Sequence, residues 1–264
     1  MTDAVSSIDR DNGAPIRIVT TAGQPSITPA SRLCLTTIDR HPHLLRGSGI
    51  DWGSGSGLLA VAAASQPGVD FVLGLEINSA EVRTSRTNAE LNGVADRTGF
   101  LVSDSYDPLP GQETSILQGL RGSTSFLIAN PPTSAGDDGL DWRRRVLAGA
   151  LQFLAPQADV LLQVSRQYGE PRTKRLADDV GGYEYRGVLE ATDWVAFDQG
   201  RPDLREALDW YAAEEARSGE PYSFLHPSED HEVDATEARR LRETTGASPR
   251  SQWRMHRFAR LFDM

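Results

Sequence analysis

Short apolar runs alternate with amphipathic stretches from about residue 49 onward, and this pattern predicts strands alternating with helices. The predicted strands are residues 49–51, 70–76, 98–103, 125–130, 158–165, 183–197 and 253–262. The predicted helices are residues 58–65, 79–92, 142–153, 172–180 and 203–217. Apolar strands that alternate with amphipathic helices are typical of a parallel sheet covered on both faces. The hydrophobic pattern therefore predicts an α/β fold.

The chain departs from this pattern at its start and in one late segment. Residues 1–15 are polar and expected to fray, residues 16–21 predict a short strand, and residues 26–41 predict a turn and a helix. We therefore divide the chain into a short N-terminal segment, residues 1–40, and one domain, residues 41–264. An insertion at about residues 198–250 is rich in acids and arginines, with Trp210, Tyr211, Tyr222 and Phe224 among the charges. It predicts either a lid over a substrate or a solvated insertion with a small apolar face.

Composition limits the class of protein. Hydrophobic residues make up 39% of the 264 residues and charged residues 24%, as in ordinary soluble globular proteins. No apolar run approaches the ~20 residues of a membrane span, and the first residues lack the features of a signal peptide. A single cysteine, Cys34, excludes an intramolecular disulfide and a cysteine-rich metal site. We expect a cytoplasmic protein without a metal.

The net charge of −10 argues against duplex DNA as a partner, because proteins that grip DNA usually present a basic face. Lys174 is the only lysine, so almost all of the positive charge is arginine. Assembled ribonucleoprotein remains compatible with this balance.

A glycine-rich loop follows the first strand of the regular pattern. Asp51, Gly53, Gly55 and Gly57 alternate with other residues just before a predicted helix, and glycine lets the backbone approach a ligand closely. Asp51 precedes the glycines, where its carboxylate can pair with a ligand ammonium. Glu76 ends the second strand, where a carboxylate can accept from both ribose hydroxyls. These groups suit S-adenosylmethionine (SAM), which has an ammonium and a ribose diol but no phosphate.

A second motif, Asn130-Pro131-Pro132, follows the fourth strand. Ligands bind at the carboxyl edge of such sheets, so a polar residue there favours a binding role. Proline lacks a backbone N–H, so the loop offers mainly acceptors, the Asn130 side-chain oxygen and the Pro131 carbonyl. Two acceptors aimed at one amino group can hold its N–H bonds and point the nitrogen lone pair at a methyl carbon.

From about Arg32 to Tyr168 the chain resembles the class I SAM-dependent methyltransferases. The resemblance implies a Rossmann-like, doubly wound, mostly parallel seven-stranded sheet with an antiparallel last strand. It also implies SAM as the cofactor. In such a site the methionine end would lie on the glycine loop, the ribose on Glu76 and the adenine on Asp104, which ends the third strand.

The Asn-Pro-Pro motif is similar to that of glutamine-amide methyltransferases acting on release factors, and of ribosomal-RNA guanine and DNA adenine amino-group methyltransferases. In those families an aromatic residue usually follows, but here the position is Thr133, which weakens a nucleobase acceptor. Trp142, Tyr168 or Trp194 could supply an aromatic ring instead. About 48 residues precede the loop, too few for the helical domain usual in release-factor enzymes.

These motifs predict methyl transfer to an amide or amino nitrogen of a protein or RNA. The alternative is a small-molecule methyltransferase with the same SAM site. His226 and His231 lie in a polar stretch that predicts a solvated loop, or else a source of a base or a metal ligand.

Overall fold

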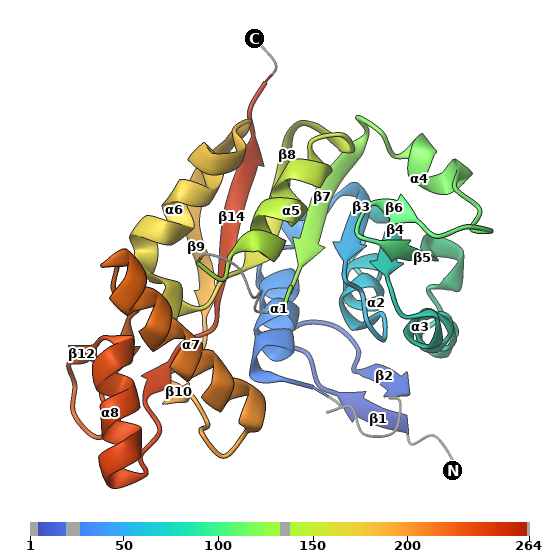
Figure 1. Cartoon of the computed structure of the whole chain (residues 1–264). Coiled ribbons are helices and arrows are strands. Elements are labelled where there is room, and N and C mark those ends of the chain that lie inside the picture. Colours follow the sequence, from blue (N-terminus) through green and yellow to red (C-terminus); the bar gives the residue numbers. More distant parts are fainter. Residues whose placement is uncertain (1–4, 20–26, 133–137, 263–264) are drawn as a thin grey trace.

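An eight-stranded sheet with helices on both faces forms the centre of the computed structural model, which describes residues 5–19, 27–132 and 138–262 (Figure 1). In spatial order the strands are β6 (Asp107–Pro108), β5 (Thr98–Asp104), β4 (Val69–Glu76), β3 (Gly47–Trp52), β7 (Thr124–Ala129), β8 (Leu154–Gln163), β14 (Arg254–Arg260) and β9 (Tyr183–Ala191).

The strand directions confirm the predicted fold. β3 pairs in parallel with both β4 and β7, and the parallel pairing continues to β5 on one side and β8 on the other. β14, the last strand in the chain, is antiparallel to β8 and β9, between which it lies. Six of the seven predicted strands are present as single strands of this sheet, and β9 is the first part of the seventh, 183–197. The two-residue β6 at one edge is too short to produce a periodic signal.

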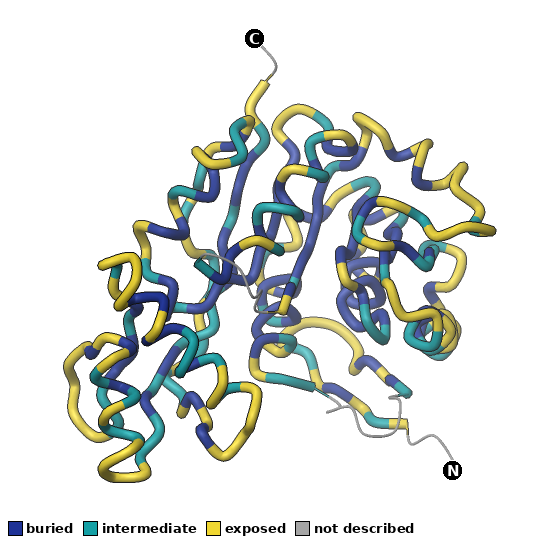
Figure 2. Tube along the Cα trace, in the orientation of Figure 1, coloured by how far each residue is buried: buried dark blue, intermediate teal, exposed yellow. Residues whose placement is uncertain are grey.

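The helices pack in two layers, one on each face of the sheet. The helices of the chain up to residue 180 are α1 (Pro29–Arg40), α2 (Leu58–Ala64), α3 (Ser79–Leu91), α4 (Ser115–Gly119), α5 (Asp141–Ala150) and α6 (Gly169–Val180). α1, α2 and α3 contribute to one apolar core and α4, α5 and α6 to the other. Neighbouring positions of a strand point to opposite faces, so Leu161 enters the first core and Leu162 the second. Figure 2 shows buried positions concentrated along these strands.

The first residues are more ordered than the sequence predicts. β1 (Val5–Ile8) pairs with β2 (Ile16–Val19) in an antiparallel hairpin, so the expectation that residues 1–15 fray is wrong from residue 5 onward. Ile8, Ile16 and Ile18 are buried in the core on the α1 side. Burial of these alternate isoleucines holds down a segment that is otherwise polar.

Residues 195–251, which lie between β9 and β14 in the sequence, form a small unit with a sheet of its own. It contains α7 (Pro202–Ser218), α8 (Ala235–Thr245) and a four-stranded sheet of β10 (Val195–Ala196), β13 (Arg250–Ser251), β11 (Phe224–Leu225) and β12 (Glu232–Val233). The predicted strand 183–197 is therefore wrong as one element, because it breaks after Ala191 and β10 joins the other sheet. Tyr211, Tyr222 and Phe224 are fully buried and extend the α5–α6 core.

None of the helices in the described ranges is both long and apolar enough to cross a bilayer.

Candidate active site

The carboxyl ends of β3, β4, β5 and β7 surround a cavity of about 390 Å³. Parallel strands end at the same edge of a sheet, which is why residues far apart in the chain meet there. Of the predicted site residues, the wall contains Gly53, Glu76, Asp104 and the Asn130-Pro131-Pro132 loop, whereas Asp51, Gly55 and Gly57 lie outside it. The remaining wall residues are Trp52, Leu75, Ile77, Ser103, Ser105 and Trp142.

The loop after β3 needs its glycines for two different reasons. Gly53, Gly55 and Gly57 have φ of +68°, +50° and +80°, a region that side chains disfavour. A Cβ on Gly57, the residue before α2, would also lie 2.5 Å from the Cβ of Ser85 on α3, so a side chain there would push α2 and α3 apart. At Gly53 a Cβ would meet no atom within 4 Å, so a side chain there would enter the open cavity.

Asp51 lies behind the loop rather than in the cavity wall. Asp51 is only 1% exposed, and one of its carboxylate oxygens accepts a hydrogen bond from the Ala60 N–H at 2.9 Å. The other oxygen has no hydrogen-bond partner within the described ranges. Burial, together with the charge of Glu76, raises the pKa of Asp51 to about 7 against the opposing Ala60 hydrogen bond. The predicted contact with a ligand ammonium stays a prediction.

Glu76 braces the glycine loop as well as facing the cavity. Its Oε2 accepts from the Gly55 N–H at 3.0 Å, and its Oε1 accepts from the Asn78 N–H at 2.8 Å. Each carboxylate oxygen has a second lone pair, so both can still accept from hydroxyls in the cavity. Glu76 therefore couples the shape of the loop to any diol bound beside it.

Asp104 is the most exposed of the predicted carboxylates. Its side chain is 55% exposed and forms an ion pair with Arg145 at 2.9 Å. An ion pair in such contact with water contributes little to stability. Asp104 can therefore exchange this partner for a donor in the cavity at small cost.

Arg143, a residue that sequence reasoning missed, anchors the Asn130-Pro131-Pro132 loop through hydrogen bonds. Arg143 on α5 is 2% exposed, and its guanidinium donates to the Pro131 carbonyl at 3.0 Å and the Pro132 carbonyl at 2.8 Å. The same group donates to the backbone and side-chain oxygens of Gln163 at the end of β8, both at 3.2 Å. One side chain thus joins the loop to the neighbouring strand.

The hydrogen bond from Arg143 reduces the number of acceptor positions that Asn130 and Pro131 can offer to a substrate amino group. The Pro131 carbonyl, expected to face an acceptor, already receives one hydrogen bond from Arg143, so one lone pair is left for another donor. Within the described ranges, no hydrogen bond is formed by the Asn130 side chain. The side-chain oxygen of Asn130 is therefore the stronger candidate for holding an acceptor.

Two tryptophans line the cavity beside this loop. The rings of Trp52 and Trp142 lie 6.1 Å apart, and the Trp52 indole N–H donates to the Ser105 hydroxyl at 2.8 Å. Ser105 has a φ of +58°, which costs free energy for a residue with a side chain. Of the three aromatic residues proposed to replace the ring missing at Thr133, only Trp142 is in the wall; Thr133 itself lies outside the described residues.

The two histidines of the polar stretch lie elsewhere, at the β11–β12 turn. Their rings are 4.8 Å apart, and the Nδ1 of His226 accepts from the Glu229 N–H at 3.1 Å. Neither histidine lines the cavity described above.

The glycine loop lies in the part of the chain that matches the profile of a known protein family. The profile of the family described as ribosomal protein L11 methyltransferase (PrmA) matches residues 28–115, a stretch that contains the loop, Glu76 and Asp104 and ends before Asn130. The chain is 42% identical over 172 residues to the ribosomal protein L11 methyltransferase of Photobacterium profundum, covering 65% of this chain and 48% of that protein. It is 34% identical over 174 residues to the protein of that name from Erwinia tasmaniensis, covering 63% and 49%.

Solved structures extend the likeness over the whole fold. A tRNA m1G37 methyltransferase of Methanocaldococcus jannaschii aligns with a TM-score of 0.54 at 11% identity, over 100% of this chain and 59% of that one. A methyltransferase from Pyrococcus furiosus aligns with a TM-score of 0.51 at 20% identity, over 67% and 84%. The chain spans about half or less of the length of the L11 methyltransferases it matches. These comparisons establish that the chain has the Rossmann-like fold of methyltransferases.

Proposed function

We propose that this protein is a SAM-dependent methyltransferase that methylates an amide or amino nitrogen of a protein. One observation carries the proposal: a single cavity brings Glu76, Asp104 and the Asn130-Pro131-Pro132 loop together from three strands. The first two are acceptors suited to a nucleoside, and the third is suited to a nitrogen that bears hydrogens.

The cavity fits the cofactor in size and in chemistry. Its volume of about 390 Å³ lies in the range of small-molecule sites, ~300–1,000 Å³. Glu76 would accept from the ribose hydroxyls and Asp104 from the adenine amino group. The loop of Gly53, Gly55 and Gly57 would follow the methionine end, with the Asp51 carboxylate behind it. When bound, SAM supplies an electrophilic methyl group on a positively charged sulfur.

The chain's own residues would orient the acceptor. The Asn130 side-chain oxygen and the free lone pair of the Pro131 carbonyl would accept the two N–H bonds, while Pro132 stiffens the loop. This arrangement favours the more tetrahedral nitrogen of the transition state. Asn130 and the Pro131 carbonyl would hold the nitrogen in line with the methyl group that SAM supplies, and the proton that the nitrogen releases after transfer would pass to water. Rate enhancement would come mainly from positioning.

Two lines of support favour a protein acceptor. The matched relatives are named for a ribosomal protein, and Thr133 stands where a nucleobase enzyme usually has an aromatic ring.

We assign residues 41–264 to the methyltransferase domain and the insertion at about 198–250 to acceptor specificity. We place the reaction in the cytoplasm, where ribosomal proteins are available as acceptors.

The test is methyl transfer from SAM carrying a labelled methyl group. The purified protein is incubated with ribosomal protein L11, with ribosomal RNA and with the small-molecule fraction of a lysate in separate reactions, and SAM affinity is measured by calorimetry. Label on a nitrogen of L11 or of another protein is the expected result. Label only on small molecules would favour a specialised-metabolite methyltransferase, and absence of SAM binding would refute both.

A further inference from the structure

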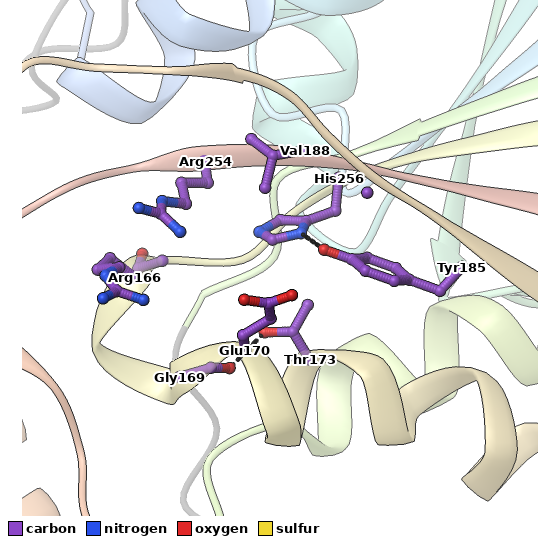
Figure 3. A pocket seen from close by; sticks show the side chains of 10 residues that line it. Arg166, Gly169, Glu170, Thr173, Tyr185, Val188, Arg254 and His256 are labelled. Atoms are coloured by element: carbon purple, nitrogen blue, oxygen red, sulfur yellow. Dashed lines mark hydrogen bonds between the residues drawn. The ribbon is translucent and has the colours of Figure 1, made fainter.

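A second cavity lies farther along the same edge of the sheet. It has a volume of about 140 Å³, between the start of α6, the strand β9 and the first residues of β14 (Figure 3). Ser165, which follows β8, and Arg254, which begins β14, are in its wall. β14 is two strand positions from β7, which ends before Asn130, so about 10 Å of sheet edge separates the cavity from the Asn130 loop.

Two arginines contribute positively charged side chains to the wall of this cavity. Arg166 is paired with Glu232 through one terminal nitrogen, but its Nε is buried and has no partner within the described ranges. Among the residues that the structure describes, the Nε and Nη2 of Arg254 donate only to the neutral side-chain oxygen of Gln252, at 3.2 and 2.7 Å. Figure 3 shows both guanidinium groups on the same side of the cavity.

Arg166 and Arg254 place two positive charges at this cavity, and the carboxylates near them, Glu170 and Glu232, are both in contact with water. Burial lowers the pKa of Arg254, and the neighbouring charge of Arg166 lowers it further. The one carboxylate in the wall belongs to Glu170, whose side chain is 59% exposed and bound to Lys174 at 2.8 Å. A pair this exposed is weak, so Glu170 can turn outward when another anion enters.

The histidine in this cavity is not available as a base. His256 lies 3.1 Å from the Val164 carbonyl, which can only accept, so its Nε2 carries the proton. Its Nδ1 therefore accepts from the Tyr185 hydroxyl at 3.0 Å. Burial lowers the pKa of His256 to about 4 despite the Val164 hydrogen bond. With both nitrogens engaged and the ring neutral, the cavity is suited to binding rather than to acid–base chemistry.

We propose that the cavity between Arg166 and Arg254 binds an oxyanion, a carboxylate or a phosphate, and serves as a subsite for an anionic group of the methyl acceptor. The site itself stands on its own contacts, and its part in acceptor binding rests on the proposed function. A volume of about 140 Å³ exceeds the ~30 Å³ of one water molecule several-fold. A larger cavity of about 470 Å³ shares Arg166, Gly169 and Glu170 and provides room for the rest of the acceptor.

The spacing of the two sites sets the distance between two groups of the acceptor. Its oxyanion would lie about 10 Å along the sheet edge from the nitrogen held at Asn130, roughly two strand spacings. In a protein, this separation corresponds to an acidic side chain or a phosphorylated residue a few positions from the methylated one, since an extended chain rises ~3.3 Å per residue.

The site is tested with inorganic phosphate and with succinate, titrated separately onto the full chain. The arginine Nε–H signals are followed by nuclear magnetic resonance and assigned with Arg166→Gln and Arg254→Gln. We expect Arg254→Gln to raise the Kd at least ~10-fold, because a charged donor pair is lost. Glu170→Gln should lower the Kd ~3-fold or more by removing the competing carboxylate. Arg186→Gln, at an exposed arginine on β9 that pairs with Glu184, is the charge-matched control.

The outcomes separate the two sources of the anion. Binding of phosphate alone assigns the site to phosphorylated acceptors, and binding of succinate alone assigns it to carboxylates. If neither binds, or if Arg254→Gln and Glu170→Gln leave the Kd unchanged, the site is refuted. Arg254→Lys keeps the charge but donates from a single point, so it should bind the anion less tightly than wild type and more tightly than Arg254→Gln, which guards against misfolding of the glutamine variant.

The acceptor role has its own readout in the methyl-transfer assay. The anion that binds should raise KM for the acceptor and leave KM for SAM unchanged, and Arg254→Gln should remove this inhibition. Inhibition that is equal in wild type and Arg254→Gln would overturn the acceptor role. If SAM and the anion both bind but no methyl group is transferred to any fraction, the proposed function fails while the oxyanion site stands.

Discussion

Replacing Arg143 with lysine keeps the positive charge beneath the Asn130 loop and removes the guanidinium fork. The arginine donates four hydrogen bonds, to the carbonyls of Pro131 and Pro132 and to two oxygens of Gln163. A lysine ammonium donates from a single point, so it cannot span the loop and the strand together. We expect at least two buried oxygens to lose their partner.

The size of the effect follows from those contacts. Hydrogen bonds to charged groups contribute about 1.5–3 kcal/mol each. Since at least two of the four bonds are lost with lysine, we expect Arg143→Lys to lower the free energy of unfolding by about 3–6 kcal/mol. The loop would also be freed to shift, and a displacement of ~1 Å at a reacting group can cost ~100-fold in rate. We therefore expect kcat to fall ~10–100-fold, with SAM affinity nearly unchanged because Arg143 does not line the cofactor cavity.

The assay separates positioning from stability. Urea unfolding gives the stability, calorimetry gives the Kd for SAM, and single-turnover transfer from labelled SAM gives the rate on the acceptor that the labelling experiment identifies. Arg257→Lys is the matched control, since Arg257 forms a two-point pair with Asp159 at 2.7 and 3.1 Å on the same sheet without touching the loop. If Arg143→Lys loses stability but keeps its full rate, Arg143 is not a positioning residue.

Three further predictions concern the cofactor cavity. Asn130→Ala should leave SAM binding nearly intact and lower turnover ~100-fold, as for removal of one oriented contact in a transition state; full activity would exclude the clamp. Glu76→Ala should weaken SAM binding ~10-fold or more by calorimetry, because it removes acceptors for the ribose and the brace on Gly55; an unchanged Kd would exclude Glu76 from the site. The folded protein raises the pKa of Asp51 to about 7, so the folded state holds a proton that the unfolded chain releases above ~pH 4. Stability should therefore fall by about 2–3 kcal/mol between pH 5 and pH 8 through this group, and Asp51→Asn should remove that part of the pH dependence in urea unfolding; an identical pH profile in the variant would refute it.

The sequence predicted the central sheet well because its inner parallel strands carry apolar runs and most of the helices between them are amphipathic. It failed where tertiary contacts decide the structure. Residues 5–8 carry too little apolar character to signal a strand, and only their pairing with residues 16–19 orders them. The stretch 183–197 mixes polar with apolar residues, and it breaks after Ala191 because its two halves pair in different sheets.

The candidate site shows the same division. Motif residues such as Gly53 and Glu76 lie at strand ends, which the pattern predicts, so their meeting in one cavity could be expected. The role of Arg143 depends on how α5 packs over the loop, which the sequence alone does not show. One signal was available: positions 143, 146, 147 and 150 have the spacing of one helix face, and all four are buried. An arginine on that otherwise apolar face marks a buried charge that needs partners.

The position of β14 has a consequence for synthesis on the ribosome. β8 and β9 both leave an unpaired edge facing the gap that residues 254–260 fill. Roughly 70 residues separate the end of β9 from the end of β14, and at ~5–20 residues per second their translation takes several seconds. During that interval two strand edges stay open to pairing with other chains. The nascent protein is therefore most vulnerable to aggregation between the synthesis of β9 and that of β14, and a chaperone that shields strand edges during this interval should raise its yield.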